Sequence, residues 1–590
     1  MKKFFILAGF SALISCGSVN HSSKQNFTWE GANMYFLLTD RFKNGDVSND
    51  VNFERKEKAA VLRGFEGGDL RGIIQKIDDN YFTDLGINAI WMTPIVEQIH
   101  GATDEGTGKT YAFHGYWAKD WTNLDPNFGT KEELKELVEK AHAKGIRVVL
   151  DAVVNHTGPV TATDPVYPNS WVRTSPQCQY NNYQNTTACT LVANLPDVLT
   201  ESNLPAELPQ MLIEKWKKEG KYEAEMKSLN DFFARTGYPK APKYYIMKWL
   251  ADYVEEFGID GYRVDTVKHT NEDVWKDFQK ICQEAFDIYK RKNPSKVLDD
   301  NLFFTVGEIY GYGISQKQQY DFGDKKVNYY QNGFKSLINF DFKGDANKSY
   351  EELFSNYSNL LHDDLNGKTV MNYLTSHDDG SPFDKERKRT FEAGTKLLLA
   401  PGISQVYYGD ESARDLTIEG ATGDATLRSN MNWTDLQNNT ESQKLLQHYQ
   451  KLGKFRANHP AVGAGVHQMI SSNPYWFTRT YNDDKVLIGL DLNSGIQEIS
   501  VEGIFENGTK LRDAYSGQMT KVENGKATIN TEFSVVLFEK NQYEKVTIFR
   551  FNIIRVQCIF AKSSRCFKNR VFERSTGSEN RHRFREESEH

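Results

Sequence analysis

The chain has few cysteines and no excess of basic residues. Only 6 of its 590 residues are cysteine and no CxxC pair occurs, so we do not expect a zinc site built from thiolates. The formal net charge of −7 argues against a nucleic-acid-binding surface. Beyond the first residues, no apolar run is long enough to span a bilayer. What remains is an ordinary globular composition, with 39% hydrophobic and 26% charged residues.

The N-terminus predicts export. Two lysines precede an apolar run over residues 4–14, which is typical of a signal peptide and too short for a membrane span. The run ends in Leu13-Ile14-Ser15-Cys16, which resembles a bacterial lipobox, where the cysteine is lipidated. We therefore predict a signal over 1–16, a polar tether over 17–32 and lipid anchorage to the bacterial membrane or cell surface through Cys16. An ordinary signal peptide or an unprocessed segment is the alternative.

Two further cysteines lie close together in an Asn-rich stretch. Cys178 and Cys189 could form a bridge in an oxidising compartment, and closing so short a loop would contribute about 2–3 kcal/mol. Cys282 lies in a helical run, where a buried, small hydrophobic side chain is expected.

Apolar strands and amphipathic helices alternate from Asn33 onward, which predicts an α/β fold with a parallel sheet. Eight such units predict a (β/α)8 TIM barrel, whose chemistry lies at the carboxyl ends of the strands. Helices are expected at 131–144 and 244–257, where apolar residues recur at spacings of three and four. The expected strands are 34–38, 89–93, 147–154, 261–264, 302–306, 337–340, 370–374 and 403–407.

The barrel is expected to occupy residues 33–156 and 242–458. Residues 157–241 are too many for a loop and predict an inserted subdomain after the third strand, with one helical piece near 205–229. Alternating stretches over 459–540 predict a C-terminal antiparallel β-sandwich. Residues 541–590 are a basic tail, which we expect to be disordered.

The segment from Gly261 to His269 carries the first candidate chemistry. Residues two apart in a strand share a face, so Arg263 and Asp265 project together, and the guanidinium keeps the carboxylate ionised. An ionised carboxylate at a strand end suits the nucleophile of a glycosidase. One such acid alone would most often be a cap or a surface charge. Three other strand ends also carry acids, in the stretches 151–156, 306–308 and 376–378.

These four stretches, in this order, resemble the signature regions of the α-amylase family of glycoside hydrolases. Leu195-Pro196-Asp197 is similar to the family's additional motif in the inserted domain. Further matches are Gly67–Leu70, His114–Trp117, Val406–Glu411 and Arg428–Trp433. The resemblance covers residues 33–539 and implies the barrel, the inserted domain and a retaining glycosidase.

The resemblance implies that Asp265 is the nucleophile and Glu308 the general acid/base. Asp378 would bind sugar hydroxyls and stabilise the transition state. A retaining mechanism needs one ionised and one protonated carboxyl group about 5–5.5 Å apart. We therefore expect neighbouring acids and a closed site to raise the pKa of Glu308.

The implied substrate-binding residues come from several strands and loops. His156 and His377 would bind the sugar at the cleavage point, Tyr116 would lie beneath it with His114 alongside, and Arg263 would support the nucleophile. Lys268 and His269 would face the leaving-group side. Neutral core histidines, and a polar pair that caps a helix, are the alternatives.

Two calcium sites are also expected. Carboxylate, amide and backbone oxygens are the ligands that Ca²⁺ prefers. The first site would use Asn44, Asp46, Asn49 and Asp50 of one turn together with Asp69, and a polar turn without metal is the alternative. By resemblance, the second would use Asn155, Asp197 and the backbone oxygen of His269.

The sequence thus predicts a monomeric enzyme that cleaves internal α-1,4 bonds of an α-glucan, with no nucleic-acid partner and no membrane contact apart from the lipid anchor. A transglycosylase of the same fold and a non-catalytic glucan-binding protein are the alternatives. One residue departs from the family pattern: Ser376 stands where many members have asparagine, which puts a chloride site in doubt.

Overall fold

The computed structural model describes residues 27–104 and 106–541. The expected signal peptide, Cys16, most of the tether and nearly all of the basic tail lie outside the described residues. No helix in the described part of the chain is both long and apolar enough to cross a membrane.

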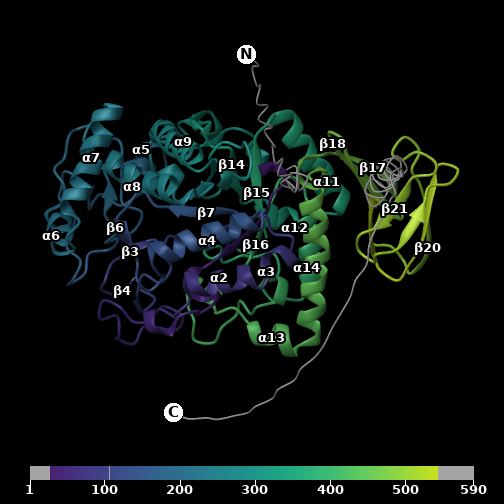
Figure 1. The fold of residues 1–590 in the computed structure, drawn as a ribbon, viewed down its shortest axis with the longest axis horizontal. Helices are drawn as coiled ribbons and strands as arrows, with labels where there is room; N and C mark the ends of the chain where they lie inside the picture. Colours follow the sequence, from purple (N-terminus) through teal and green to yellow (C-terminus); the bar gives the residue numbers. More distant parts are fainter. Residues whose placement is uncertain (1–26, 105, 542–590) are drawn as a thin grey trace, which may run out of the picture. The chain divides into compact units, whose positions relative to one another are not determined.

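Eight parallel strands close into a barrel in the order β1, β2, β7, β10, β11, β14, β15, β16 (Figure 1). Every residue of these strands is buried, because side chains fill the barrel and helices cover it. The predicted fold class is confirmed, and each expected strand overlaps an observed one. The strands are β1 (Asn33–Leu37), β2 (Ala89–Met92), β7 (Arg147–Ala152), β10 (Gly261–Val264), β11 (Phe304–Gly307), β14 (Ser336–Asn339), β15 (Thr369–Tyr373) and β16 (Ile403–Tyr407).

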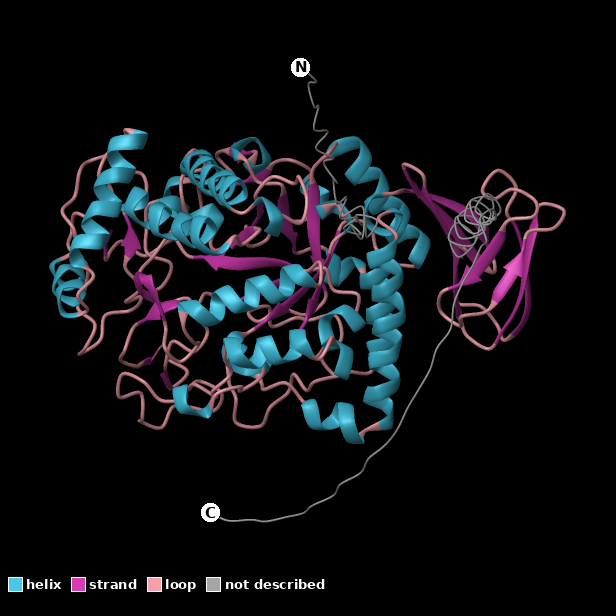
Figure 2. Ribbon diagram, in the orientation of Figure 1, coloured by secondary structure: helices cyan, strands magenta, loops and turns pink. Residues whose placement is uncertain are grey.

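Amphipathic helices surround the barrel (Figure 2). The helix α4 (Lys131–Ala143) begins at a capping box between Thr130 and Glu133, and its apolar residues at spacings of three and four are buried. The helix α8 (Pro242–Phe257) ends at Gly258, whose φ of 74° is left-handed and favours glycine. The other principal helices are α2 (Leu70–Asp78), α9 (Val274–Lys292), α11 (Tyr350–Asn359), α12 (Thr390–Leu399) and α14 (Thr440–Asn458).

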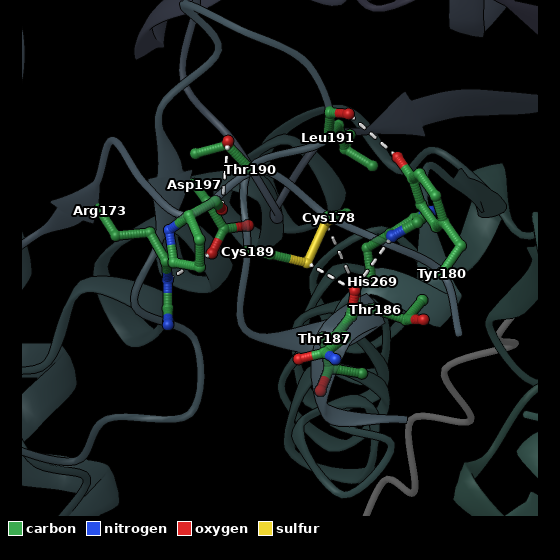
Figure 3. The surroundings of a disulfide bond; sticks show 12 residues. Arg173, Cys178, Tyr180, Thr186, Thr187, Cys189, Thr190, Leu191, Asp197 and His269 are labelled. Carbon is green, nitrogen blue, oxygen red and sulfur yellow. Dashed lines mark hydrogen bonds and ion pairs between the residues drawn. A yellow bond between two sulfur atoms is a disulfide. The ribbon is translucent and has the colours of Figure 1, made fainter. Parts of the chain in front are cut away.

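The long connection between β7 and α8 forms the expected insertion. It contains the short strands β8 (Val172–Arg173) and β9 (Asp197–Val198) and the helices α5 (Gln184–Thr187), α6 (Gln210–Lys218) and α7 (Tyr222–Thr236). The single helical piece expected near 205–229 is two helices, because Gly220 has a left-handed φ of 72° between them. The expected Cys178–Cys189 disulfide is present (Figure 3), and Cys282 is free and buried.

A second excursion, after β2, was not predicted. The strands β3 (Val96–Gln98) and β6 (Ala118–Leu124) form an antiparallel pair, as do β4 (Thr103–Asp104) and β5 (Lys109–Thr110). β3, β4 and β5 are too short to show periodicity, and the apolar residues of the longer β6, at 118, 121 and 124, recur every three residues instead of every two. This excursion carries His114 and Tyr116.

Two antiparallel sheets follow the barrel. The first has the order β17 (Val466–Ser472), β18 (Tyr475–Tyr481), β19 (Asp484–Leu490), β24 (Val535–Lys540), β21 (Lys510–Asp513), β22 (Met519–Lys521). The second pairs β20 (Gly495–Ser500) with β23 (Lys526–Thr531). Side chains from both sheets, including Trp476 and Ile529, share a separate apolar core.

An ion triad joins the end of α14 to the first of these sheets. His459 Nδ1 lies 2.7 Å from Asp484 Oδ1, and its Nε2 lies 2.7 Å from Glu539 Oε2. Burial disfavours the charged imidazole, but the hydrogen bonds and charges of the two acids raise the pKa of His459 to about 9. The triad therefore holds a charged histidine at neutral pH.

We expect His459→Gln to destabilise the protein at pH 6 by up to about 3 kcal/mol, with the difference shrinking toward pH 10. A pKa raised by folding stabilises the protein fully below the unfolded value of about 6.5, and this contribution is lost as pH rises through about 9. Urea unfolding of both proteins at several pH values measures the difference. A difference that does not change with pH would show that packing, not charge, carries the effect.

Candidate active site

One buried arginine contacts three carboxylates at the carboxyl ends of β7, β10 and β11. Arg263 Nη1 donates to Asp265 Oδ1 at 2.6 Å and to Asp151 Oδ1 at 3.1 Å, and its Nη2 lies 3.0 Å from Glu308 Oε2. The strand register explains this convergence, because Arg263 pairs with Asp151 on one side and with Val306 on the other. One guanidinium cannot neutralise three acids, so at least one of them is driven toward its protonated form.

Glu308 has the environment of an acid. Burial raises its pKa to about 8, and the nearby Asp265 and Asp378 charges add to the shift although Arg263 opposes it. This is the direction expected from the sequence. At neutral pH the group is therefore mostly protonated and able to donate its proton.

The backbone of Thr266 holds the Glu308 carboxyl group. The Thr266 N–H donates to Glu308 Oε2 at 2.8 Å. Thr266 has a φ of 48°, which is costly for a β-branched residue and persists only where the surroundings impose it. The sequence provided no prediction for Thr266, because no residue pattern indicates that a threonine has a left-handed backbone conformation.

Asp378 is the most exposed of the three proposed catalytic acids. Its side chain is 32% exposed, against 8% for both Asp265 and Glu308. Ser376 Oγ donates to Asp378 Oδ1 at 2.8 Å. Burial alone would raise the pKa of Asp378, but the positive charge of Arg263 and the Ser376 hydroxyl help to hold it below its ordinary value. The residue that departs from the family pattern thus orients this acid.

The predicted sugar-binding side chains are brought together beside these acids. The Tyr116 ring stacks on His377 at 5.3 Å and lies nearly parallel to His114 at 5.8 Å. His156 Nε2 lies 3.1 Å from the Tyr116 carbonyl oxygen, to which it donates. Burial lowers the pKa of all three histidines, so they are neutral near pH 7, and each imidazole then has one donor and one acceptor nitrogen.

Asp151 is a site residue to which the sequence analysis gave no role. It accepts hydrogen bonds from Tyr116 Oη at 2.9 Å and from Trp91 Nε1 at 3.1 Å. Burial raises its pKa to about 7, against the opposing charge of Arg263. Its position near the end of a predicted strand, like that of Arg263, was the sequence signal that could have identified it. Asp151 therefore orients both the tyrosine and the arginine.

Lys268 and His269 line a cavity together with Glu308. The cavity has a volume of about 400 Å³ and is lined by Tyr180, Thr266, Lys268, His269, Glu308 and Tyr310. Lys268 Nζ donates to the Tyr310 carbonyl oxygen at 2.8 Å, and His269 Nδ1 donates to the Thr186 carbonyl oxygen at 3.0 Å. The pair is thus part of the cleft wall on the Glu308 side.

Side-chain hydrogen bonds join four of the five residues expected at the first calcium site into two pairs, and the N–H of the fifth, Asp46, donates to Asp69 Oδ2 at 2.8 Å. Asn44 Nδ2 donates to Asp50 Oδ1 at 2.8 Å, and Asn49 Nδ2 lies 3.4 Å from Asp69 Oδ2. The Oδ1 atoms of Asn44 and Asn49 are buried and accept no hydrogen bond from any described residue. Asp46 differs, because its carboxylate accepts hydrogen bonds from the N–H and hydroxyl of Ser48.

The second expected set is also buried. Asn155 Oδ1 accepts from Thr270 Oγ1 at 3.1 Å, and Asp197 Oδ2 lies 2.8 Å from Arg173 Nε. Asp197 Oδ1 has no hydrogen-bond partner among residues 27–104 and 106–541. His269 follows β10 of the barrel, and its imidazole contacts the insertion at the Thr186 carbonyl oxygen. No cluster of three or more His, Cys, Asp or Glu side chains suited to a metal occurs in the described residues, so both sets depend on amide or backbone oxygens.

A (β/α)8 barrel that gathers acids around one arginine at its strand ends is an arrangement suited to a glycoside hydrolase. The family model for the alpha-amylase catalytic domain matches residues 36–454. The chain belongs to the α-amylase family of glycoside hydrolases, and it is an enzyme of that class.

Similar proteins include hydrolases and transferases. The chain is 35% identical over 520 residues to the periplasmic alpha-amylase of Escherichia coli (strain K12), covering 78% of this chain and 72% of that protein. It is 26% identical over 513 residues to a cyclomaltodextrin glucanotransferase of Geobacillus stearothermophilus, covering 83% and 63%. A crystal structure of an Anoxybacillus alpha-amylase shares the fold, with a TM-score of 0.60 and 24% identity over 88% of this chain and 99% of that one.

Proposed function

We propose that this enzyme hydrolyses internal α-1,4-glucosidic bonds of starch, glycogen or maltooligosaccharides with retention of configuration. The proposal rests on one observation: two acids that contact the same arginine have different environments. Asp265 makes the shortest contact with Arg263, at 2.6 Å, whereas burial and neighbouring negative charges raise the pKa of Glu308 to about 8. One ionised and one protonated carboxyl group are what a retaining glycosidase requires.

In the proposed mechanism, Asp265 attacks the anomeric carbon while Glu308 protonates the departing glucosidic oxygen. This step gives a glycosyl ester on Asp265 and releases one part of the glucan. Glu308, now ionised, takes a proton from the water that attacks the same carbon, and both carboxyl groups are restored. Arg263 remains charged throughout, and Asp378 binds sugar hydroxyls in the orientation that Ser376 gives it.

Transfer to a sugar instead of water is the second candidate, and the likeness to cyclomaltodextrin glucanotransferases supports it. The two reactions share the glycosyl-enzyme and differ only in the acceptor. Timed digestion of amylose, pullulan and maltotriose, followed by mass analysis, distinguishes them. Shorter linear products at all times support hydrolysis, whereas cyclic or lengthened glucans at early times would replace it with transfer.

Structural calcium completes the proposal. Asn44, Asn49, Asp50 and Asp69 would hold one ion, since two buried amide oxygens there have no other described partner. Asn155, Asp197 and the backbone oxygen of His269 would hold a second ion, which would connect the insertion to the barrel. A bound cation at either position supplies charge neutralisation and cross-links loops.

We expect a strong chelator to lower the melting temperature by about 2–3 °C, the effect in a chain of this length of removing one ion present at 100 times its Kd. Calorimetry with and without chelator measures this shift. Asp50→Asn should melt lower than the wild type and respond less to the chelator. Asp46→Asn should respond as the wild type does, because that carboxylate faces Ser48. An unchanged melting temperature in chelator would contradict structural calcium.

Export with lipid anchorage through Cys16 is part of the same proposal. The periplasmic location in the name of the E. coli relative and the Cys178–Cys189 disulfide support an oxidising compartment. We propose a monomer that binds an α-glucan and reaches the membrane only through the anchor. Cys16→Ser should move the protein from the membrane fraction to the soluble exported fraction.

A further inference from the structure

The two oxygens of the Glu308 carboxyl group have different surroundings. Oε2 accepts a hydrogen bond from the Thr266 N–H at 2.8 Å and lies 3.0 Å from Arg263 Nη2. Within residues 27–104 and 106–541, no donor forms a hydrogen bond with Oε1. Glu308 and Thr266 also line the cavity of about 400 Å³. The carboxyl group therefore has one oxygen held by two donors and one oxygen that the described residues leave free.

This difference determines where the proton of the neutral acid lies. A guanidinium group and a backbone N–H can only donate hydrogen bonds, so the oxygen that receives both must present its lone pairs to them. A hydrogen atom on Oε2 would compete with both donors, whereas a hydrogen atom on Oε1 meets neither. The proton that Glu308 can give away therefore belongs on Oε1.

A left-handed turn at Thr266 directs its N–H toward Glu308. Thr266 directly follows Asp265 and has a φ of 48° and a ψ of 38°. The next N–H, that of Val267, donates to the main-chain carbonyl oxygen of Glu308 at 2.9 Å. Successive N–H groups in such a turn form a concave pair of donors that suits a negatively charged group. Glu308 thus receives one N–H on its side chain and the next on its backbone.

The surroundings of Thr266 impose this conformation, which is costly for a β-branched residue. The Thr266 carbonyl oxygen accepts from the His269 N–H at 2.9 Å, and the Val267 carbonyl oxygen accepts from Trp275 Nε1 at 3.1 Å. Val267 and Trp275 are fully buried. The Thr266 hydroxyl is buried and has no hydrogen-bond partner among the described residues. The contribution of Thr266 to the site therefore comes from its backbone.

We propose that Thr266 is a positioning residue for the general acid, because its N–H holds Oε2 of Glu308 and leaves the transferable proton on Oε1. This inference rests on the proposed function. In the first step, the Oε1–H bond breaks and the proton passes to the departing glucosidic oxygen, which takes the electron pair of its bond to the anomeric carbon while Asp265 bonds to that carbon. In the second step, Oε1 takes a proton from the attacking water. Arg263 and the Thr266 N–H keep their protons throughout.

The N–H of Thr266 also influences the acidity of Glu308. Burial raises the pKa of Glu308 to about 8, and the Thr266 N–H is among the groups that oppose this shift, because it stabilises the ionised form. Loss of the N–H should therefore raise the pKa further and move the alkaline limb of kcat/KM to higher pH. The other charged or titratable groups that face Glu308 are Arg263, Asp265, Asp378, Lys268, His269 and Tyr310.

The test removes this N–H alone from the full-length enzyme. Suppression of a stop codon with the α-hydroxy analogue of threonine replaces the amide between residues 265 and 266 by an ester. The alkaline limb on maltohexaose should move up by about one pH unit, the effect of one hydrogen bond to a charged group. At pH 7, kcat/KM on maltohexaose should fall about three- to tenfold. For α-maltotriosyl fluoride, whose leaving group needs much less protonation, kcat/KM should change less than about twofold.

Two matched variants separate this N–H from other causes. An ester at residue 267 removes the Val267 hydrogen bond to the Glu308 backbone, so it should lower the melting temperature as much as the 266 ester does and leave the alkaline limb at the wild-type pH. Thr266→Val keeps the branched side chain and the N–H but lacks the hydroxyl. It should keep the wild-type limb and stay within about twofold of the wild type on both substrates.

Neutron diffraction from deuterated crystals at pD 7 locates the proton directly, and we expect deuterium on Oε1 of Glu308. Deuterium on Oε2, an unmoved alkaline limb in the 266 ester, or equal losses on the two substrates would each overturn the inference. A limb that moved in Thr266→Val would assign the effect to the hydroxyl instead of the backbone. Failure of the wild type to cleave either substrate is a distinct outcome, since it would refute the proposed function itself.

Discussion

Asp265→Asn is expected to lower kcat on maltooligosaccharides on the order of 10⁴-fold, as loss of a covalent nucleophile does. Asparagine has nearly the same shape and keeps an oxygen for the Arg263 contact now made at 2.6 Å. Its amide is a poor nucleophile toward the anomeric carbon, so the glycosyl-enzyme cannot form. Steady-state kinetics on maltohexaose measures the loss.

The matched control is Asp231→Asn. Asp231 forms an exposed ion pair with Lys227 on α7, and exposed pairs contribute little to stability. We expect this variant to keep wild-type activity, and both variants to melt near the wild-type temperature. If Asp265→Asn cleaved maltohexaose at the wild-type rate, the nucleophile would have to be another residue.

Glu308→Gln should lower kcat on maltohexaose by about 10²–10⁴-fold, the usual contribution of a general acid or base. Glutamine can still accept the Thr266 N–H but has no proton to donate to the leaving oxygen. Fluoride needs much less protonation than a sugar alkoxide. A burst of fluoride from α-maltotriosyl fluoride should therefore survive in this variant, followed by slow turnover because water is no longer activated.

The same residue sets the expected pH dependence. Glu308 must be protonated in the first step, and burial raises its pKa to about 8, so kcat/KM should be sustained at pH 7 and fall as pH rises through about 8. This alkaline limb should be absent from the residual activity of Glu308→Gln. A limb that persists in the variant would assign the titration to a different group.

The barrel could be predicted from the sequence because its strands are buried on both faces. Segments such as Gly261–Val264 and Ile403–Tyr407 are short strand-like stretches between amphipathic helices, and the structure gives these two the expected bounds. The excursion after β2 was missed, because β4 and β5 have two residues each and leave no periodic pattern.

The proposed acids were also found from the sequence, because each follows a strand and parallel strands end at one edge of the barrel. What each acid does depends on neighbours that are distant in the chain. Burial and the nearby charges of Asp265 and Asp378 raise the pKa of Glu308, and the N–H of Thr266, a residue with left-handed backbone, donates to its carboxyl group. The resemblance to the family gave the direction of the Glu308 shift, but the left-handed backbone at Thr266 cannot be derived from local residue patterns.

The sequence by itself determined the barrel, the insertion, the order of the strand-end acids and the cysteine pair, since these follow from hydrophobic patterning and residue identity. Only the tertiary structure decided that Arg263 contacts three carboxylates and that the bridged loop brings Tyr180 to the cavity beside Glu308. It also decided that the Asp46 carboxylate accepts hydrogen bonds from Ser48 while the Asp46 N–H donates to Asp69. The reason is physical. The hydrophobic pattern of the sequence determines which residues are buried, whereas pKa values and the residues that line a cavity depend on contacts between segments far apart in the chain.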